Sequence, residues 1–303
     1  MPAPLTGLWP PASTPFTASG AVDEARHVKH CRTLLAEGST GLAILGTTSE
    51  ANSLTLAERR RAIEALVAAG IPAGQLLPGT GACAIDDAVA LSRYAGEIGC
   101  AGVLLLPPFY YKNVSDEGLF QFVAAVIERC GAKAPKILLY HFPQMAAAGW
   151  SVALIGRLIK AFPGVVVGMK DSSGNADNTK TVIDAYPGFA VFPGAEVYLL
   201  KALQWGAVGC ISATANVNAR GISQLIVHQH DANAAERQAE LVAIRSSFDG
   251  FVTVPAVKAV LAAKYRDAEW NRVRPPVLPL SEQERTALLA KAPIVRLLEA
   301  VPA

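Results

Sequence analysis

The sequence predicts an α/β protein, a (β/α)8 TIM barrel with a C-terminal helical extension. Eight short apolar runs alternate with helical patterns over roughly the first 230 residues. The apolar runs are continuous, which is typical of parallel strands buried on both faces. A doubly wound sheet is the alternative that the same alternation allows. We expect residues 1–230 to form the barrel that carries the active site, and residues 231–303 to form helices packed on it.

The composition excludes several classes of protein. With 303 residues, 51% of them hydrophobic, the chain is long enough for a large core. A net charge of +2 without Lys/Arg clusters predicts no nucleic-acid partner. Charges and prolines interrupt every apolar run, so we expect no membrane span. The N-terminal segment has no basic start and no long apolar core, so no signal peptide is predicted. The five cysteines form no C-x-x-C pair, which favours a reduced, cytoplasmic protein. His228 and His230 have no partners at ligand spacing, so no metal site is predicted.

Each predicted strand is an apolar run, and each is followed by a segment with helical spacing. The strands are expected within residues 7–16, 40–50, 75–81, 101–109, 136–142, 164–170, 189–194 and 207–213. Helical patterns that follow the first seven lie within residues 22–38, 54–70, 84–99, 115–131, 151–162, 175–186 and 196–206. The tail is predicted to be helical only, within residues 234–248, 254–266 and 281–300.

Capping signals delimit two of these helices. Thr55 and Glu58 have the spacing of a capping box, and Gly70 is expected to end the helix that they begin. Ser281 and Glu284 have the same spacing in the tail. The helical assignment of these segments therefore has a local signal besides the periodicity.

In a (β/α)8 barrel the active site lies at the C-terminal ends of the strands. Applied to the predicted strands, this rule selects a small set of residues. They are Gly46, Thr47, Thr48 and Glu50 after the second strand, Tyr110 and Tyr111 after the fourth, Tyr140 at the end of the fifth, Lys170 at the end of the sixth, Gly194 and Glu196 after the seventh, and Ile211 and Ser212 at the end of the eighth.

The segment GVVVGMKDSSGN is an apolar run of strand type that ends on a lysine, Lys170. A lysine inside the mouth of a barrel is poorly solvated, and desolvation disfavours the ammonium form. A neutral amine can attack a ketone and form a Schiff base, and the protonated imine is an electron sink for making and breaking carbon–carbon bonds. The alternative is a lysine whose ammonium group extends from the strand end into water.

Two further features support chemistry at Lys170. The GTTSE turn can direct backbone N–H groups and the hydroxyls of Thr47 and Thr48 at an anion, such as the carboxylate of a 2-oxo acid. Tyr140, with Tyr110 or Tyr111, could pass protons along a chain of hydroxyls that includes Thr47. For each feature taken alone, an ordinary capped loop or a packed tyrosine is the alternative.

Taken together, these segments resemble the dihydrodipicolinate synthase and N-acetylneuraminate lyase family of class I, pyruvate-dependent aldolases. The resemblance runs from about Leu5 into the tail. It is carried by GTTSE, PPFYY, LLYHFP, GMKDSSGN around Lys170, GCISATANVNAR, and VPAVK in the tail. It implies a (β/α)8 barrel with a helical extension, a homotetramer or dimer, and no metal or organic cofactor.

The resemblance also implies a role for each matching residue. Lys170 would form the Schiff base with pyruvate, and Tyr140 would act as acid and base beside the imine. Tyr110 or Tyr111 would complete a proton relay through Tyr140 and Thr47, and would reach into a neighbouring subunit's site. The pyruvate carboxylate would be held by Thr47 and Thr48. The predicted substrate-binding residues are Gly46, Thr48, Met145, Ser172, Gly194, Glu196 and Ile211.

Departures from the family pattern bear on the substrate. Met145 stands where dihydrodipicolinate synthases carry an arginine that binds a substrate carboxylate. His141 replaces the usual asparagine, and Asp171 and Ser172 follow the lysine where the synthases have Glu-Ala. Glu196 lies where sialic acid lyases bind a polyol, but the rest of their polar set is missing.

We therefore expect a Schiff-base lyase or aldolase that acts on pyruvate and an aldehyde, or on the 2-oxo acid formed from them. Cleavage of a 2-keto-3-deoxy acid, by a 2-keto-3-deoxy acid aldolase or an N-acetylneuraminate lyase-like enzyme, is the favoured reaction. The alternatives are a dehydratase of such an acid, a 4-hydroxy-tetrahydrodipicolinate synthase, which Met145 disfavours, and a non-catalytic sensor of 2-oxo acids.

Overall fold

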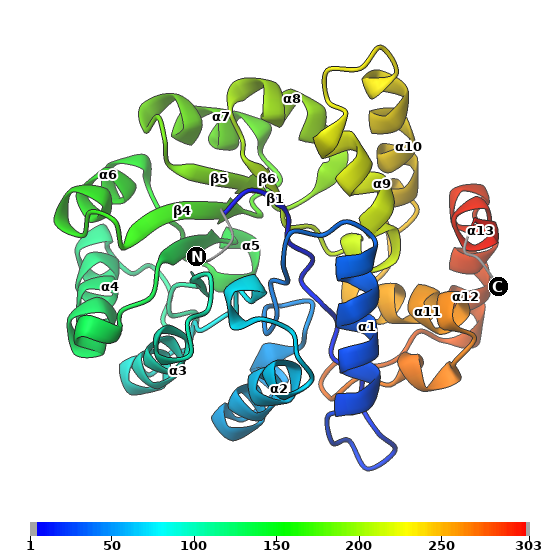
Figure 1. Ribbon diagram of the computed structural model, residues 1–303, viewed down its shortest axis with the longest axis horizontal. Helices are drawn as coiled ribbons and strands as arrows, with labels where there is room; N and C mark the ends of the chain where they lie inside the picture. Colours follow the sequence, from blue (N-terminus) through cyan, green and yellow to red (C-terminus); the bar gives the residue numbers. More distant parts are fainter. Residues whose placement is uncertain (1–4, 301–303) are drawn as a thin grey trace.

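Short parallel strands form a ring that helices surround, which confirms the predicted (β/α)8 barrel (Figure 1). The computed structural model describes residues 5–300. Four strands form one parallel sheet in chain order, and two more pair with each other. The strands are β1 (Gly7–Leu8), β2 (Val103–Leu105), β3 (Ile137–His141), β4 (Val166–Asp171), β5 (Ala190–Pro193) and β6 (Gly209–Cys210).

Backbone hydrogen bonds between the two sheets close the ring. On one side the residues that flank β6 are bonded to β5, and β6 pairs with β1. On the other side residues 40–46 and then residues 75–81 lie between β1 and β2. The joining bonds run from Val208 N–H to Val191 O (3.1 Å), from Ala43 N–H to Pro10 O (2.9 Å), from Leu77 N–H to Leu42 O (2.8 Å) and from Leu104 N–H to Pro78 O (2.9 Å).

The strand predictions were too generous in the first four βα units and in the last, where β2 and β6 have only three and two residues. Residues 40–46 and 75–81 make only isolated parallel bridges, and the strand expected within residues 7–16 is two residues long. Proline explains part of this difference, because Pro10 and its neighbour Pro11 have no N–H with which to continue a ladder. The closed ring therefore relies on backbone hydrogen bonds between segments that are not regular strands, such as Leu77 N–H to Leu42 O (2.8 Å) and Gly79 N–H to Ile44 O (2.8 Å).

Each barrel segment is followed by a helix, and the helical tail is also present. Two helices differ from the prediction. The tail pattern of residues 281–300 forms two helices, since Pro293 lies in the first turn of the second. The four-residue helix that begins at Pro143 was not predicted. The α-helices are α1 (Glu24–Ala36), α2 (Leu56–Ala68), α3 (Ile85–Glu97), α4 (Asp116–Cys130), α5 (Pro143–Ala146), α6 (Val152–Ala161), α7 (Ala176–Ala185), α8 (Leu199–Trp205), α9 (Ala215–Val227), α10 (Ala234–Ser246), α11 (Thr253–Tyr265), α12 (Glu282–Leu289) and α13 (Ala292–Glu299).

Both predicted capping boxes are present. The Thr55 hydroxyl accepts from the Glu58 N–H while the Glu58 carboxylate accepts from the Thr55 N–H, and Ser281 and Glu284 repeat this exchange. These reciprocal bonds satisfy N–H groups that the first turn of a helix leaves without partners. The starts of α2 and α12 are therefore encoded locally.

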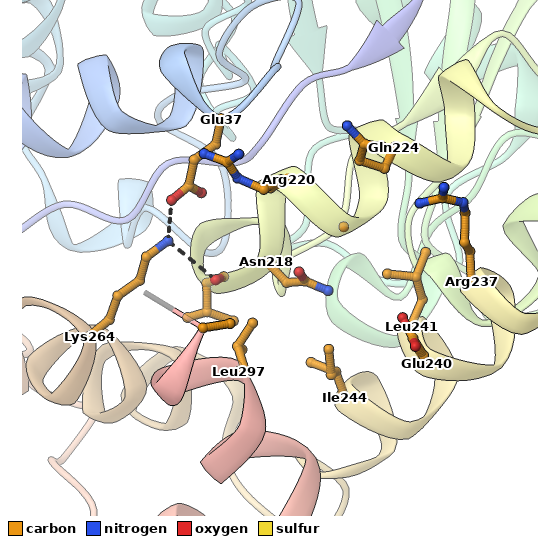
Figure 2. Close-up of a pocket in the computed structure, with 13 residues that line it drawn as sticks. Glu37, Asn218, Arg220, Gln224, Arg237, Glu240, Leu241, Ile244, Lys264 and Leu297 are labelled. Carbon is orange, nitrogen blue, oxygen red and sulfur yellow. Dashed lines mark hydrogen bonds and ion pairs between the residues drawn. The ribbon is translucent and has the colours of Figure 1, made fainter. Parts of the chain in front are cut away.

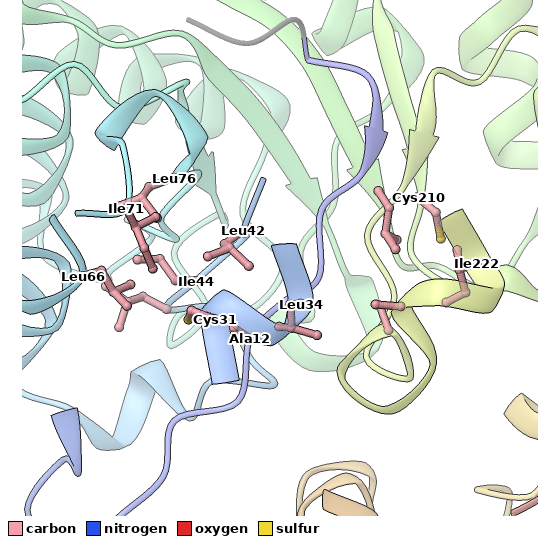
Figure 3. Close-up of a cluster of buried hydrophobic side chains, with 14 of the residues drawn as sticks. Ala12, Cys31, Leu34, Leu42, Ile44, Leu66, Ile71, Leu76, Cys210 and Ile222 are labelled. Carbon is pink, nitrogen blue, oxygen red and sulfur yellow. The ribbon is translucent and has the colours of Figure 1, made fainter. Parts of the chain in front are cut away.

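Buried side chains form separate layers inside the barrel and between the barrel and its helices. Figure 3 shows the second kind, where Leu42, Ile44 and Leu76 of the barrel wall lie near Leu34 of α1 and Leu66 of α2. Inside the barrel, one cluster combines side chains from segments all around the ring. Its buried members are Trp9, Ala43, Leu77, Ala101, Leu104, Leu138, Tyr140, Phe192 and Ile211. This filled interior leaves the strand ends as the place for a site.

The C-terminal helices have a core of their own, in which Val217 of α9 packs with residues of α11 and with Trp270. We propose the division into a barrel of residues 1–230 and a helical extension of residues 231–303, of which residues 301–303 lie outside the described chain. Among residues 5–300, no helix combines the length and the apolar character needed to cross a membrane.

Candidate active site

Lys170 and Tyr140 lie side by side at the C-terminal ends of β4 and β3. Their Cα atoms are register partners in the parallel ladder, so their side chains point to the same face. Lys170 is 4% exposed, and its Nζ lies 4.2 Å from the centre of the Tyr140 ring. The structure therefore places an amine and a phenol side by side at the mouth of the barrel, at the strand ends where the sequence predicted them.

The Tyr140 hydroxyl also meets the GTTSE turn. Thr47 Oγ1 lies 3.3 Å from the Tyr140 hydroxyl oxygen, so two members of the predicted relay are in contact. The turn folds back on itself through Ala51 N–H to Gly46 O (3.1 Å) and Glu50 N–H to Thr47 O (3.0 Å). Glu50 has φ +55, a left-handed conformation that costs a non-glycine residue free energy. Other contacts must hold this turn in place.

A small cavity of about 20 Å³ opens between the turn and the barrel wall. Gly46, Thr47 and Tyr140 line it, as does Arg59 of α2, which the sequence analysis missed. Arg59 is buried and donates to Gly79 O (2.6 Å), and burial lowers the pKa of its guanidinium to about 10. Its spacing from Ala62, Ile63 and Leu66 was the available signal, because it places a cation on the buried face of α2.

The loop after Lys170 is held by a dense set of polar contacts. The Asp171 carboxylate accepts from Ser173 N–H (2.9 Å), Asn178 Nδ2 (2.8 Å) and Thr179 Oγ1 (2.7 Å). Ser172 N–H donates to His141 O (2.7 Å) across the strands. A Cβ at Gly194 would lie 2.2 Å from Ser172 Oγ, so this close approach needs glycine. The predicted residues Ser172 and Gly194 are thus in contact beside Lys170.

The remaining barrel residues of the predicted set are buried. Ile211 belongs to the interior cluster that contains Tyr140, and Thr48 in the GTTSE turn is buried as well. The Glu196 carboxylate accepts hydrogen bonds from the hydroxyls of Ser212 and Thr214. In this single chain, protein hydroxyls therefore occupy the position where a polyol contact was expected from Glu196.

Three predicted residues lie on the surface instead. Tyr110 and Tyr111 are 73% and 72% exposed, and their rings meet edge to face at 5.4 Å. Within residues 5–300, neither hydroxyl is hydrogen-bonded to Tyr140 or Thr47. Met145 on α5 is 59% exposed. One chain thus assembles Lys170, Tyr140 and Thr47 but leaves the loop tyrosines in solvent.

A larger cavity, of about 290 Å³, lies away from these residues among the C-terminal helices (Figure 2). Its lining includes Glu37, Asn218, Arg220, Arg237 and Lys264, and none of the predicted site residues. Among residues 5–300, no three His, Cys, Asp or Glu side chains gather as a metal site.

Comparisons with known proteins agree with the fold. The family model described as the dihydrodipicolinate synthetase family matches residues 4–293. An uncharacterized DapA-like lyase of Chloroflexus aurantiacus is 35% identical over 91% of this chain and 92% of its own length. The crystal structure of dihydrodipicolinate synthase from Agrobacterium tumefaciens has a TM-score of 0.89 at 32% identity, covering 98% of this chain and 100% of that one. A prophage protein of the dihydrodipicolinic acid synthase family from E. coli K12, solved in complex with pyruvate, has a TM-score of 0.87 at 26% identity and covers 96% and 98%.

Proposed function

Since the chain belongs to the dihydrodipicolinate synthetase family and is a class I, Schiff-base lyase of that family, we propose that Lys170 forms the Schiff base and that the enzyme cleaves a 2-keto-3-deoxy acid into pyruvate and an aldehyde. Enzymes of this family use a lysine Schiff base and no separate cofactor. The observation that carries the assignment to Lys170 is its burial at the end of β4 against the Tyr140 ring, with the Thr47 hydroxyl beyond.

The proposed reaction begins with attack of the neutral Lys170 amine on the C2 carbonyl carbon. Tyr140 donates the proton with which the C2 hydroxyl leaves as water, which gives a protonated imine and a tyrosinate. Tyr140 then takes the proton of the C4 hydroxyl, the C3–C4 bond breaks, and its electron pair moves into the imine to give an enamine while the aldehyde leaves. Protonation of the enamine at C3 and hydrolysis of the imine release pyruvate and restore the lysine. Thr47 and Thr48 bind the carboxylate, with Gly46, Ser172, Gly194 and Ile211 around the pyruvate part. Met145 faces the remainder of the substrate, and Glu196 contacts it by exchanging its hydrogen bonds with Ser212 and Thr214 for bonds to the substrate.

The exposed tyrosines lead to a proposal about assembly. Tyr110 or Tyr111 extends into the site of a neighbouring copy in a homotetramer or dimer, and there it completes the proton relay. Mixing a Lys170→Ala protein with a Tyr110→Phe or Tyr111→Phe protein should restore activity for the tyrosine that serves in the relay, because each copy then supplies the group that the other lacks. A fully active isolated monomer would refute the shared site.

A cytoplasmic location is part of the proposal and fits five cysteines that are all free thiols.

A second candidate is the synthase reaction, which condenses pyruvate with aspartate semialdehyde. It is favoured by the name of the Agrobacterium relative. Met145 disfavours it, because a substrate carboxylate at this position would lack an arginine. A charge-assisted hydrogen bond is worth about 1.5–3 kcal/mol, so its loss costs roughly 10- to 150-fold in rate or binding.

Steady-state assays with a panel of aldehydes distinguish the two candidates. We expect weak condensation with aspartate semialdehyde and better turnover with neutral polyhydroxy aldehydes, assayed in the condensation direction. Met145→Arg should improve the use of aspartate semialdehyde. If aspartate semialdehyde is the best substrate of the unmodified enzyme by a wide margin, the lyase assignment is wrong. A protein that traps no 2-oxo acid with borohydride would instead be a sensor.

A further inference from the structure

Glu50, the last residue of the GTTSE turn, is buried and forms an ion pair with Lys258 of α11. The side chains of Glu50 and Lys258 are 1% and 0% exposed. Lys258 Nζ donates to Glu50 Oε1 and also to Arg272 O (2.7 Å). A lysine from the C-terminal helices thus reaches the turn that carries Thr47 and Thr48.

The same segment contacts the turn at two further points. The second carboxylate oxygen of Glu50 accepts from Arg274 N–H (2.9 Å). The Arg274 guanidinium donates through Nη1 to Ser53 O (2.8 Å), just after the turn. The carboxylate of Glu50 is therefore satisfied on both oxygens by residues more than two hundred positions away in the sequence.

These contacts continue to the reacting groups. Glu50 N–H donates to Thr47 O (3.0 Å), and the Thr47 hydroxyl lies 3.3 Å from that of Tyr140. The left-handed backbone of Glu50 is a strained conformation, which persists only where its surroundings impose it. In this turn the surroundings are the Lys258 ammonium and the Arg274 backbone.

We propose that Lys258 is a positioning residue of the active site, which fixes the carboxylate-binding turn through its ion pair with Glu50. The C-terminal helices thereby contribute to binding of the 2-oxo acid, although they carry none of the proposed reacting groups. This inference rests on the proposed function. If Lys258 loses its charge, the Glu50 carboxylate is left buried without a counter-charge, and the turn must rearrange to solvate it.

Lys264 provides a matched control on the same helix. Its Nζ donates to Glu37 Oε1 (2.7 Å) and to Val217 O (3.3 Å), beside the larger cavity of Figure 2. Its side chain is 4% exposed, so it too is a buried lysine that ties α11 to a glutamate of the barrel. Glu37, however, follows α1 and lies outside the GTTSE turn. Loss of tethering alone would affect both lysines, whereas positioning of the turn concerns Lys258.

The experiment compares Lys258→Met with Lys264→Met at a temperature where both are folded. The pyruvate concentration that gives half-maximal borohydride adduct is measured, together with the thermal midpoint. We expect both variants to have lower midpoints. Lys258→Met should raise the half-saturating pyruvate concentration about 10- to 100-fold, in line with the cost of a displaced binding group. Lys264→Met should leave it unchanged.

Each outcome decides whether Lys258 positions the GTTSE turn or only tethers α11 to the barrel. An unchanged pyruvate requirement in Lys258→Met, or an equal increase in Lys264→Met, overturns the positioning role. If Lys258→Met does not fold, Glu50→Gln takes its place, because the amide keeps the shape while removing the charge, and unaltered pyruvate binding in that variant also overturns the role. A wild-type protein that forms no adduct overturns the proposed function, and the inference falls with it.

Discussion

Lys170 and Lys258 are both buried in apolar segments, and their surroundings differ. Lys258 on α11 is bonded to the Glu50 carboxylate and to the Arg272 carbonyl oxygen. Lys170 on β4, at 4% exposure, lies against the Tyr140 ring, and among residues 5–300 it pairs with no carboxylate. The charge of Lys258 is balanced by the Glu50 carboxylate, whereas the Lys170 amine faces the groups that we assign to catalysis.

The difference shows that burial by itself does not identify a reactive lysine. Burial lowers the pKa of Lys258 to about 8, and the Glu50 carboxylate opposes this shift, so the side chain is still mostly protonated at pH 7. An ion-paired, protonated amine is a poor nucleophile. An amine without a carboxylate partner can bond to a carbonyl carbon without first breaking an ion pair. The partner of each lysine therefore indicates its role.

Covalent trapping gives the largest expected contrast between the two lysines. Pyruvate and borohydride should label Lys170 and leave Lys258 unlabelled, as determined by mass spectrometry of peptides. Lys170→Ala should lose both the adduct and turnover, because no other amine occupies the end of β4. A label on Lys258, or an adduct in Lys170→Ala, would contradict the assignment.

Tyr140 tests whether the surroundings of Lys170 are catalytic. Tyr140→Phe keeps the ring beside the lysine and removes the hydroxyl, so turnover should fall about 10²- to 10⁴-fold, as for loss of a general acid–base group. Tyr186→Phe is a suitable control, since the Tyr186 hydroxyl donates to Val152 O between helices and touches none of the site residues named here. Equal effects of the two substitutions would remove the catalytic role of Tyr140.

Substitution of Lys258 should reduce folding stability more than substitution of Lys170, although Lys170 matters more for adduct formation. Lys258→Met leaves Glu50 buried and unpaired, which should lower the free energy of unfolding by about 3–5 kcal/mol. Lys170→Met removes a buried amine that has no carboxylate partner, so the free energy of unfolding should fall much less. Urea denaturation of both variants checks this, and equal losses of stability would show that the two lysines do not differ as the contacts indicate.

Mild acid should lower the free energy of unfolding through two buried histidines, at pH values above those at which most carboxylates become protonated. His27 and His30 of α1 are buried, and His30 bonds Tyr265 of α11 through Nδ1 (2.8 Å). Burial lowers the pKa of His27 to about 4 and that of His30 to about 3. The unfolded chain therefore takes up protons near pH 6.5 while the folded chain does not.

The resulting stability is complete above about pH 7 and is lost as the pH falls below the unfolded pKa of about 6.5. Between pH 7.5 and pH 5 we expect each histidine to contribute a loss of about 2 kcal/mol. Urea midpoints at the two pH values measure it, and His27→Leu should reduce the pH dependence by removing one of the two groups. Midpoints that do not change with pH would contradict the buried, neutral state of these histidines.

Local patterns determined the fold class and most of the helices. Continuous apolar runs and helical spacing are properties of neighbouring residues, and capping boxes such as Thr55–Glu58 act within one turn. The same patterns overestimated the strands at residues 40–46 and 75–81. Whether an apolar run forms a regular ladder depends on the backbone of its neighbours, which the sequence of the run does not contain.

For the candidate site, the sequence by itself determined which residues lie at strand ends, and that was enough to select Lys170, Tyr140 and Thr47. Only the tertiary structure decided which of them touch and what surrounds them. The ion pair of Lys258 with Glu50 spans 208 positions, and no local pattern connects them. The physical reason is that electrostatic and hydrogen-bonding partners are set by distance in space, whereas periodicity and capping report only on residues within a few turns.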